Sequence, residues 1–93
     1  MSKYEIRTTN KFEKDVKLAI KRGLYLEKLL EVVKLLSEGN SLPEHYRDHI
    51  LKGDYKGYRE CHIEPDWLLI YSKQETIKII SLERTGTHSD LFG

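Results

Sequence analysis

Four histidines lie in the second half of the chain, where their side chains could carry out acid–base chemistry: His45, His49, His62 and His88. Histidine transfers protons readily near neutral pH because its ordinary pKa is about 6.5. Cleavage of RNA by its own 2′-hydroxyl needs two such groups. A base removes the 2′ proton, the 2′ oxygen attacks the neighbouring phosphorus, and an acid protonates the leaving 5′ oxygen.

Three further kinds of side chain in this half of the chain would support that reaction. The planar guanidinium of Arg84 could bind the negative charge that develops on the phosphoryl oxygens. Asp66 could orient a histidine or accept a proton itself. The rings of Trp67 and Phe92 could stack on an unpaired base.

Each of these candidates also has an ordinary structural interpretation. His45 is expected to be a polar surface residue, and Asp66 directly after Pro65 is typical of a turn. Trp67 begins an apolar run and would more often lie in a core, while Arg84 could be a solvated strand end. The residue types alone therefore leave the role of each side chain open.

A zinc site is the competing chemistry, with a ligand set of His49, His62, Asp66 and His88. The spacing of these residues matches no compact ligand motif, and a nearby arginine would repel a cation. The sequence also contains no glycine-rich phosphate loop and no dinucleotide-binding fingerprint. We therefore expect a reaction without a metal or another cofactor.

The N-terminal half predicts a strand and two helices. A strand is predicted over 4–8, and Asn10, with Glu13 three residues later, is typical of a helix N-cap. In this helix apolar residues fall on one side and lysines on the other, namely Phe12, Val16, Ala19 and Ile20 against Lys11, Lys14, Lys17 and Lys21. Gly23 ends it, and a second helix is predicted over 24–37 as its antiparallel partner. The buried stripe of that second helix is predicted to be Leu26, Leu29, Leu30, Val33 and Leu36.

After the loop at 40–43 the spacing of apolar residues changes to that of strands. A short extended segment at 48–51 precedes strands over 56–63, 67–72 and 76–84, which should form an antiparallel meander. The segment 67–72 is apolar on both sides, so we expect both of its faces to be covered. The chain is thus predicted to be one α+β domain over 1–93, with an N-terminal strand and a helical hairpin packed on a small antiparallel β-sheet.

The composition is that of a globular protein, with 39% hydrophobic and 33% charged residues. No apolar run approaches the roughly 20 residues of a membrane helix, and the first five residues lack the apolar stretch of a signal peptide. Cys61 is the only cysteine, which excludes an internal disulfide and suggests a small buried hydrophobe. We therefore expect a cytoplasmic protein that contacts no membrane.

The net charge is only +1, but positive charge is concentrated at the N-terminus. Residues 1–22 carry seven basic and three acidic side chains. This concentration favours RNA-backbone binding by the helix lysines, Lys11, Lys14, Lys17 and Lys21. The ordinary alternative is that these lysines are the solvated side of an amphipathic helix.

Three motifs in the second half change the balance between these interpretations. They are DH-x-L-x-G around His49, KGYR-x-x-H-x-EPDW-x-LIY from Lys56, and ERTGTH-x-x-LFG at the C-terminus. Together they cover about half of the chain, and KDVKLA-x-KRG at 14–23 fits as well. In this combination the chain resembles the YafQ family of bacterial toxins, within the RelE/ParE superfamily. The resemblance implies a RelE-like fold.

The resemblance also implies an activity and a set of partners. Members of this family are ribosome-dependent mRNA interferases, which cut the codon in the 30S A site without a metal and leave a 2′,3′-cyclic phosphate. A DinJ- or RelB-like antitoxin would hold the toxin inactive, in a heterotetramer. Operator DNA would be bound only through the antitoxin. Two alternatives remain, namely a ParE-like toxin that inhibits DNA gyrase, and an inactive co-repressor that binds only the antitoxin.

Carried over residue by residue, the resemblance implies a catalytic set of His49, His62, Asp66, Arg84 and His88, with Trp67 and Phe92 contacting RNA. We predict His62 or His49 as the base, His88 as the acid and Arg84 as the phosphate stabiliser. The division of proton transfer among the histidines depends on geometry, which spacing in the sequence does not supply.

Overall fold

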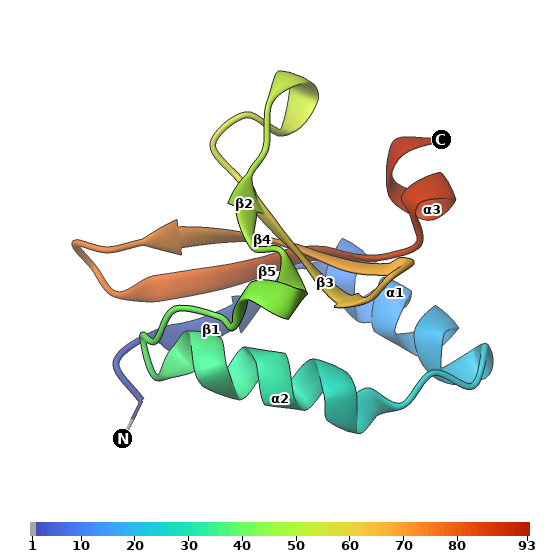
Figure 1. Cartoon of the computed structure of the whole chain (residues 1–93), viewed down its shortest axis with the longest axis horizontal. Helices are drawn as coiled ribbons and strands as arrows, with labels where there is room; N and C mark the ends of the chain where they lie inside the picture. The colour runs from blue at the N-terminus through green and yellow to red at the C-terminus, as the bar shows by residue number, and fades with distance from the viewer. Residues whose placement is uncertain (1) are drawn as a thin grey trace.

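A computed structural model describes residues 2–93, and a five-stranded sheet with the strand order β1-β5-β4-β3-β2 organises the fold (Figure 1). The strands are β1 (Glu5–Thr8), β2 (His49–Ile50), β3 (Arg59–Glu64), β4 (Trp67–Gln74) and β5 (Ile79–Gly86). The helices are α1 (Asn10–Lys21), α2 (Leu26–Ser37) and α3 (His88–Phe92), with short 3-10 turns η1 (Glu44–Tyr46) and η2 (Gly53–Tyr55). The α+β class and the order of elements are as predicted.

The predicted antiparallel meander is confirmed for four of the five strands. β2, β3, β4 and β5 pair with one another in antiparallel fashion. β1 instead pairs with β5 in parallel, so the sheet is mixed and not purely antiparallel. A parallel neighbour needs a long crossover, and here α1, α2 and the whole meander lie between the two paired strands in sequence.

Helix α1 starts at Asn10, and its N-cap is the preceding residue, Thr9. The prediction that Asn10 is the N-cap is therefore wrong by one residue. The Thr9 backbone is extended, and its hydroxyl oxygen accepts a hydrogen bond from the Phe12 N–H at 3.0 Å. Glu13 accepts a hydrogen bond from the Thr8 hydroxyl at 2.8 Å and so takes part in no capping box with Asn10. At the other end Gly23 adopts φ +82°, the left-handed conformation expected of a residue that terminates a helix.

The buried sides of the two long helices differ from the prediction by single residues. In α1, Phe12 and Ala19 are buried and the four lysines are exposed as predicted, but Ile20 is exposed. In α2, Val32 is buried where Leu30 was predicted, and Leu30 is exposed. α2 also starts at Leu26, because Gly23 and the two residues after it form the turn out of α1.

The two faces of the sheet carry two separate apolar clusters. The larger one packs residues of β3, β4 and β5 against α1 and α2, with Trp67, Leu69 and Tyr71 from β4 at its centre. The smaller one lies on the opposite face, where Leu68 and Ile70 of β4 meet Leu91 of α3. Figure 1 shows α2 on one side of the sheet and α3 on the other. The prediction that 67–72 is covered on both faces is therefore confirmed.

Among residues 2–93, no helix combines the length and the apolar character that a bilayer crossing would need.

Candidate active site

Three of the four histidines form a row on the face of the sheet that carries α3. The ring centroid of His49, on β2, lies 6.3 Å from that of His62, on β3, and the His62 centroid lies 5.8 Å from that of His88, the first residue of α3. His45 lies outside this row of centroids. Its ring is tilted against that of Tyr46, with 4.1 Å between the centroids, and it lines a pocket together with His62.

Each histidine of the row has its Nδ1 atom held by an oxygen. Nδ1 of His49 lies 2.6 Å from the Arg47 carbonyl, and Nδ1 of His62 lies 3.3 Å from the Pro65 carbonyl. Nδ1 of His88 lies 3.0 Å from Oδ1 of Asp66. A carbonyl or carboxylate oxygen only accepts, so each Nδ1 carries a proton and Nε2 is the free position. The row therefore presents three Nε2 atoms that can give or take protons.

Glu60 is a site residue that sequence reasoning missed. It is only 4% exposed, and its Oε1 lies 3.5 Å from Nε2 of both His49 and His62. The register explains this position, since Glu60 pairs with His49 across β2 and β3 and precedes His62 by two residues, on the same face of the strand. The alternation of β3 could have revealed it, since residues two apart share a face.

Asp66 is confirmed as a close neighbour of a histidine, and that histidine is His88. Its Oδ1 accepts from both the backbone N–H and Nδ1 of His88, each at 3.0 Å. The backbone hydrogen bond, followed by the side-chain hydrogen bond, lowers the pKa of Asp66 below its ordinary value. Asp66 is therefore a charged acceptor that fixes the orientation of the His88 ring.

Helix α3, which carries His88, is fixed in place by a second acidic residue. Thr87 and Asp90 form a reciprocal capping box at its N-terminus. The same Asp90 carboxylate accepts from both terminal nitrogens of Arg22, at the end of α1, at 2.6 and 3.2 Å. The Arg22 hydrogen bond is the main reason that the pKa of Asp90 is strongly lowered. This pair links the two helices across 68 residues of sequence.

Arg84 lies on β5 with its guanidinium held by Asp15 of α1. Nε of Arg84 lies 2.6 Å and one terminal nitrogen 3.2 Å from the Asp15 carboxylate, which also accepts from the Thr85 N–H at 3.1 Å. This hydrogen bond to Asp15 raises the pKa of Arg84 above its ordinary value. The predicted phosphate stabiliser is therefore pre-oriented by a residue 69 positions away in sequence.

The two aromatic residues that were predicted to contact RNA differ in their exposure to solvent. Phe92 is 48% exposed and continues the histidine row, with its ring centroid 6.3 Å from that of His88. Trp67 is 2% exposed in the larger apolar cluster, and its indole N–H donates to Thr85. Because neither face of the Trp67 ring is open, the prediction that it stacks on a base is wrong. Tyr55, which the sequence did not single out, lies 5.6 Å from Phe92 instead.

Comparison with known families agrees with this arrangement. Residues 4–93 match the family model described as the bacterial toxin of type II toxin-antitoxin systems, YafQ. The chain belongs to the YafQ toxin family. It is similar to the mRNA interferase toxin YafQ of Escherichia coli strain K12, at 47% identity over 94 residues that span 100% of both chains. It is also 33% identical to the putative toxin YafQ of Haemophilus influenzae, covering 91% of this chain and 88% of that one.

Solved structures of YafQ toxins share this fold. The Escherichia coli DinJ-YafQ toxin-antitoxin complex superposes with a TM-score of 0.89 at 46% identity, covering 98% of this chain and 99% of that one. A metal-bound toxin from Helicobacter pylori also reaches 0.89, at 43% identity and with 96% and 99% covered.

Among residues 2–93, one group of side chains could hold a metal ion. Glu60, His62 and His88 each offer one ligand atom, and these atoms lie within 4.8 Å of one another. The group shares His62 and His88 with the ligands considered from sequence, but it contains neither His49 nor Asp66 and includes Glu60. Imidazole and carboxylate ligands suit zinc or copper. An ion bound there would occupy the Nε2 atoms that the acid–base chemistry needs.

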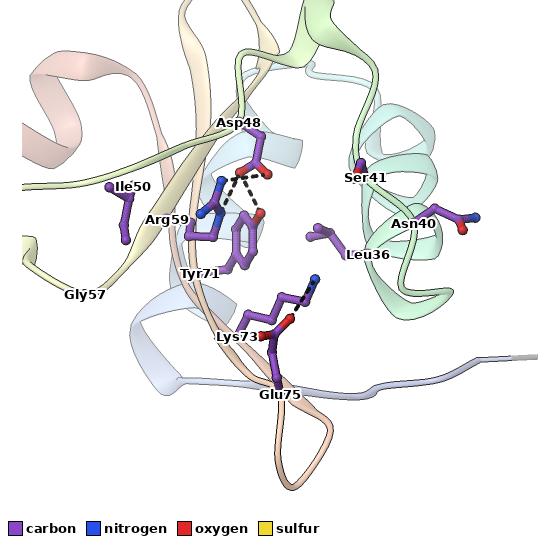
Figure 2. A pocket seen from close by; sticks show the side chains of 10 residues that line it. All are labelled: Leu36, Asn40, Ser41, Asp48, Ile50, Gly57, Arg59, Tyr71, Lys73 and Glu75. Atoms are coloured by element: carbon purple, nitrogen blue, oxygen red, sulfur yellow. Dashed lines mark hydrogen bonds and ion pairs between the residues drawn. The ribbon is translucent and has the colours of Figure 1, made fainter.

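A cavity of about 320 Å³ in this YafQ-family chain lies on the side of β2 and β3 away from the row and is lined by Asp48, Arg59 and Tyr71 among others (Figure 2). In it Asp48 accepts hydrogen bonds from the Tyr71 hydroxyl at 2.6 Å and from Arg59 at 3.3 Å. Burial, followed by the Asp48 hydrogen bond, raises the pKa of Tyr71 well above its usual range. Asp48 directly precedes His49, so this network fixes the segment that presents the first histidine of the row. Cys61 is fully buried as expected, and burial raises the pKa of its thiol.

Proposed function

We propose that this chain is an endoribonuclease toxin that cuts mRNA in the ribosomal A site by activating the 2′-hydroxyl of the RNA. The observation that carries the proposal is the row of three histidines, each with Nδ1 held by an acceptor, which leaves Nε2 for proton transfer. Such a row supplies a base and an acid close together, as the reaction requires. The similarity to an mRNA interferase toxin at 47% identity over the full chain supports the same conclusion.

The geometry favours a division of labour among the histidines. His49 and His62 both face the Glu60 carboxylate, which would stabilise the cation that either forms on taking the 2′ proton. His88, held by Asp66, serves as the acid for the leaving 5′ oxygen, with its Nε2 as the donor. Arg84 binds the charge that develops on the phosphoryl oxygens. The proposed reaction uses no metal.

The lysines of α1 are proposed to bind RNA backbone, in the mRNA or in the 30S subunit. Lys11, Lys14, Lys17 and Lys21 are all exposed. Phosphate contacts of this kind give affinity without sequence preference. They would hold the toxin on the RNA, and the active site would determine the position of the cut.

The proposed regulator is a DinJ-like antitoxin, because a YafQ from Escherichia coli has been solved in complex with DinJ. We further propose a heterotetramer in which the antitoxin alone contacts operator DNA. The protein is proposed to act in the cytoplasm, where translating ribosomes are found.

Purified protein added to ribosomes programmed with a defined mRNA tests the proposal. Cleavage in the A-site codon is expected for the wild type in buffers freed of transition metals, with Mg²⁺ kept for the ribosome. His62→Ala and His88→Ala should each lose about 10²-fold or more in rate. Equal cleavage by these variants, or inhibition of DNA gyrase without any mRNA cleavage, would rule out the assignment.

A further inference from the structure

A small cleft lies beside the histidine row, at the edge of the sheet where α1 begins. Its volume is about 150 Å³, and its lining residues are Thr9, Lys11, Tyr55, Glu83 and Arg84. Tyr55 connects it to the row, because its ring meets Phe92 edge to face at 5.6 Å and Phe92 lies 6.3 Å from His88. The cleft is therefore a neighbour of the proposed cutting site and separate from the histidines.

One side of the cleft is suited to a phosphate. A guanidinium has five N–H donors, and Asp15 takes two of those on Arg84, which leaves three. Arg84 and Tyr55 both line the cleft, so the guanidinium and the tyrosine ring border the same space. Lys11 adds a second positive charge in the first turn of α1, where the helix dipole also favours an anion.

The other side of the cleft is suited to a base. Tyr55 lies in an aromatic cluster with Phe92 and with Tyr58, whose ring centroid is 6.2 Å away. Neighbouring rings in edge-to-face contact hold Tyr55 in place without covering it by stacking. Tyr55 is half-buried, and the open part of its ring borders the cleft together with Arg84 and Lys11. Base–aromatic stacking accepts any base, and an aromatic ring beside cations is the usual arrangement for a single-stranded nucleotide.

We propose that this cleft binds the mRNA nucleotide next to the cut, with its base stacked on Tyr55. Arg84 and Lys11 then hold the phosphate that joins this nucleotide to the cut site, which is the phosphate that Arg84 stabilises in the proposed reaction. The inference rests on the proposed function, since it identifies the substrate contact that Trp67 does not make. The Glu83 carboxylate would repel a second phosphate. It would instead accept a hydrogen bond from the base or from a ribose hydroxyl.

The test measures binding separately from cleavage. A short single-stranded RNA with 2′-O-methyl groups throughout lacks the attacking hydroxyl and is titrated into the isolated protein, with chemical shifts as the readout. We expect shifts at Tyr55 and Arg84, and a loss of affinity of roughly 5- to 150-fold in Tyr55→Ala, the range for one stacked base. Tyr55→Phe should keep the affinity within about twofold, because the ring performs the stacking.

Two controls make the result decisive. Tyr25→Ala removes a tyrosine that is 67% exposed at the N-cap of α2 and does not line the cleft, so it should not change the affinity. A blunt-ended RNA duplex, whose bases cannot stack on protein, should bind without shifting Tyr55. Equal affinities for Tyr55→Ala and wild type, no binding by the wild type, or equal shifts with the duplex would each overturn the inference. If one of these three results is found while the protein still cleaves mRNA on the ribosome, the nucleotide cleft is wrong and the proposed function remains supported. If the protein binds the RNA at Tyr55 but does not cleave mRNA on the ribosome, the proposed function is wrong and the nucleotide cleft remains supported.

Discussion

At the scale of single residues, the histidine row works because its neighbours fix where each proton sits. His49, His62 and His88 come from three different elements, yet each has its Nδ1 atom against an oxygen acceptor. Glu60 then faces two of the free Nε2 atoms from a buried position. A buried carboxylate this close to both rings places a negative charge beside the proposed proton transfer.

Removing the charge of Glu60 tests this role. Glu60→Gln keeps the shape of the side chain, and we expect kcat on programmed ribosomes to fall by about 10- to 100-fold, part of the value of a positioned base. KM should stay within about twofold, because the carboxylate faces the histidines of the proposed reaction. Glu75→Gln, at an exposed position, is the control. An unchanged kcat in Glu60→Gln would show that the carboxylate is only structural.

The Asp66–His88 contact makes a prediction about pH. The pKa of Asp66 lies below its ordinary value of about 3.9, so the stabilising contact is present above that value and is lost as pH falls through the lowered pKa. Carboxyl chemical shifts followed in an acid titration should report a depressed pKa for Asp66. In His88→Ala the side-chain partner is gone, so the pKa should move up toward 3.9. The same titration curve in both proteins would contradict the contact.

Sequence reasoning succeeded for residues that share a local motif and failed for those brought together by register. His62 and Asp66 flank one turn, and Asp66 was expected to orient a histidine, although His88 was not identified as that histidine. Asp15 meets Arg84 only because α1 runs along β5, a contact across 69 residues. Trp67 was predicted to contact RNA, although its position at the start of an apolar run already favoured burial in the core. The structure places Trp67 in the core.

At the scale of elements, the short helix α3 depends on a partner outside itself. Five residues make too little hydrogen bonding for a stable isolated helix. The Arg22–Asp90 pair, the capping box and the contact of Leu91 with the sheet hold α3 in place. Gly86 lies tightly against this helix, since a Cβ there would meet Oδ2 of Asp90 at 2.9 Å.

Breaking the link between α1 and α3 should reduce activity without unfolding the protein. In Arg22→Ala we expect kcat to fall several-fold, because His88 loses its fixed position, and amide exchange in 88–92 to become faster. Arg22→Lys should restore part of the rate. The matched control is Arg7→Ala, which breaks a pair of the same 2.6 Å length with Glu5 on β1, far from the site. Equal effects of Arg22→Ala and Arg7→Ala would exclude a positioning role.

Element boundaries show which physical signals the sequence carried. The strands of the meander were predicted from alternation and turns, whereas the parallel pairing of β1 with β5 has no local signal. The N-cap of α1 was predicted at Asn10, one residue too late, because Asn is also a good capping residue. Thr9 is the N-cap, and its hydroxyl also donates a hydrogen bond to the Glu83 carbonyl on β5.

At the scale of the whole molecule, the exposed lysines and the site lie on different parts of the surface. α1 packs on the face of the sheet that carries the larger apolar cluster and leaves its lysines exposed, whereas the histidine row lies on the face that carries α3. The N-terminus of α1 joins the two at the proposed nucleotide cleft, through Lys11. A nucleic acid held along α1 would thus be led toward Arg84.

Salt dependence tests this docking. Lys14→Ala removes one cation of α1, and the slope of log affinity for ribosomes against log salt should decrease by about 0.7–0.9, the value for one lost phosphate contact. Lys34→Ala, on the exposed surface of α2, should leave the slope unchanged. If the two variants behave alike, the α1 lysines are simply solvated.

The central claim is that the RNA's own 2′-hydroxyl performs the attack, with the histidines moving its protons. The most direct measurement uses ribosomes programmed with an mRNA that carries one 2′-deoxy nucleotide at the position of the cut. The account predicts that this single change abolishes cleavage at that position, while the all-ribose mRNA is cut and ends in a 2′,3′-cyclic phosphate. Cleavage of the 2′-deoxy mRNA at the same phosphate would contradict it.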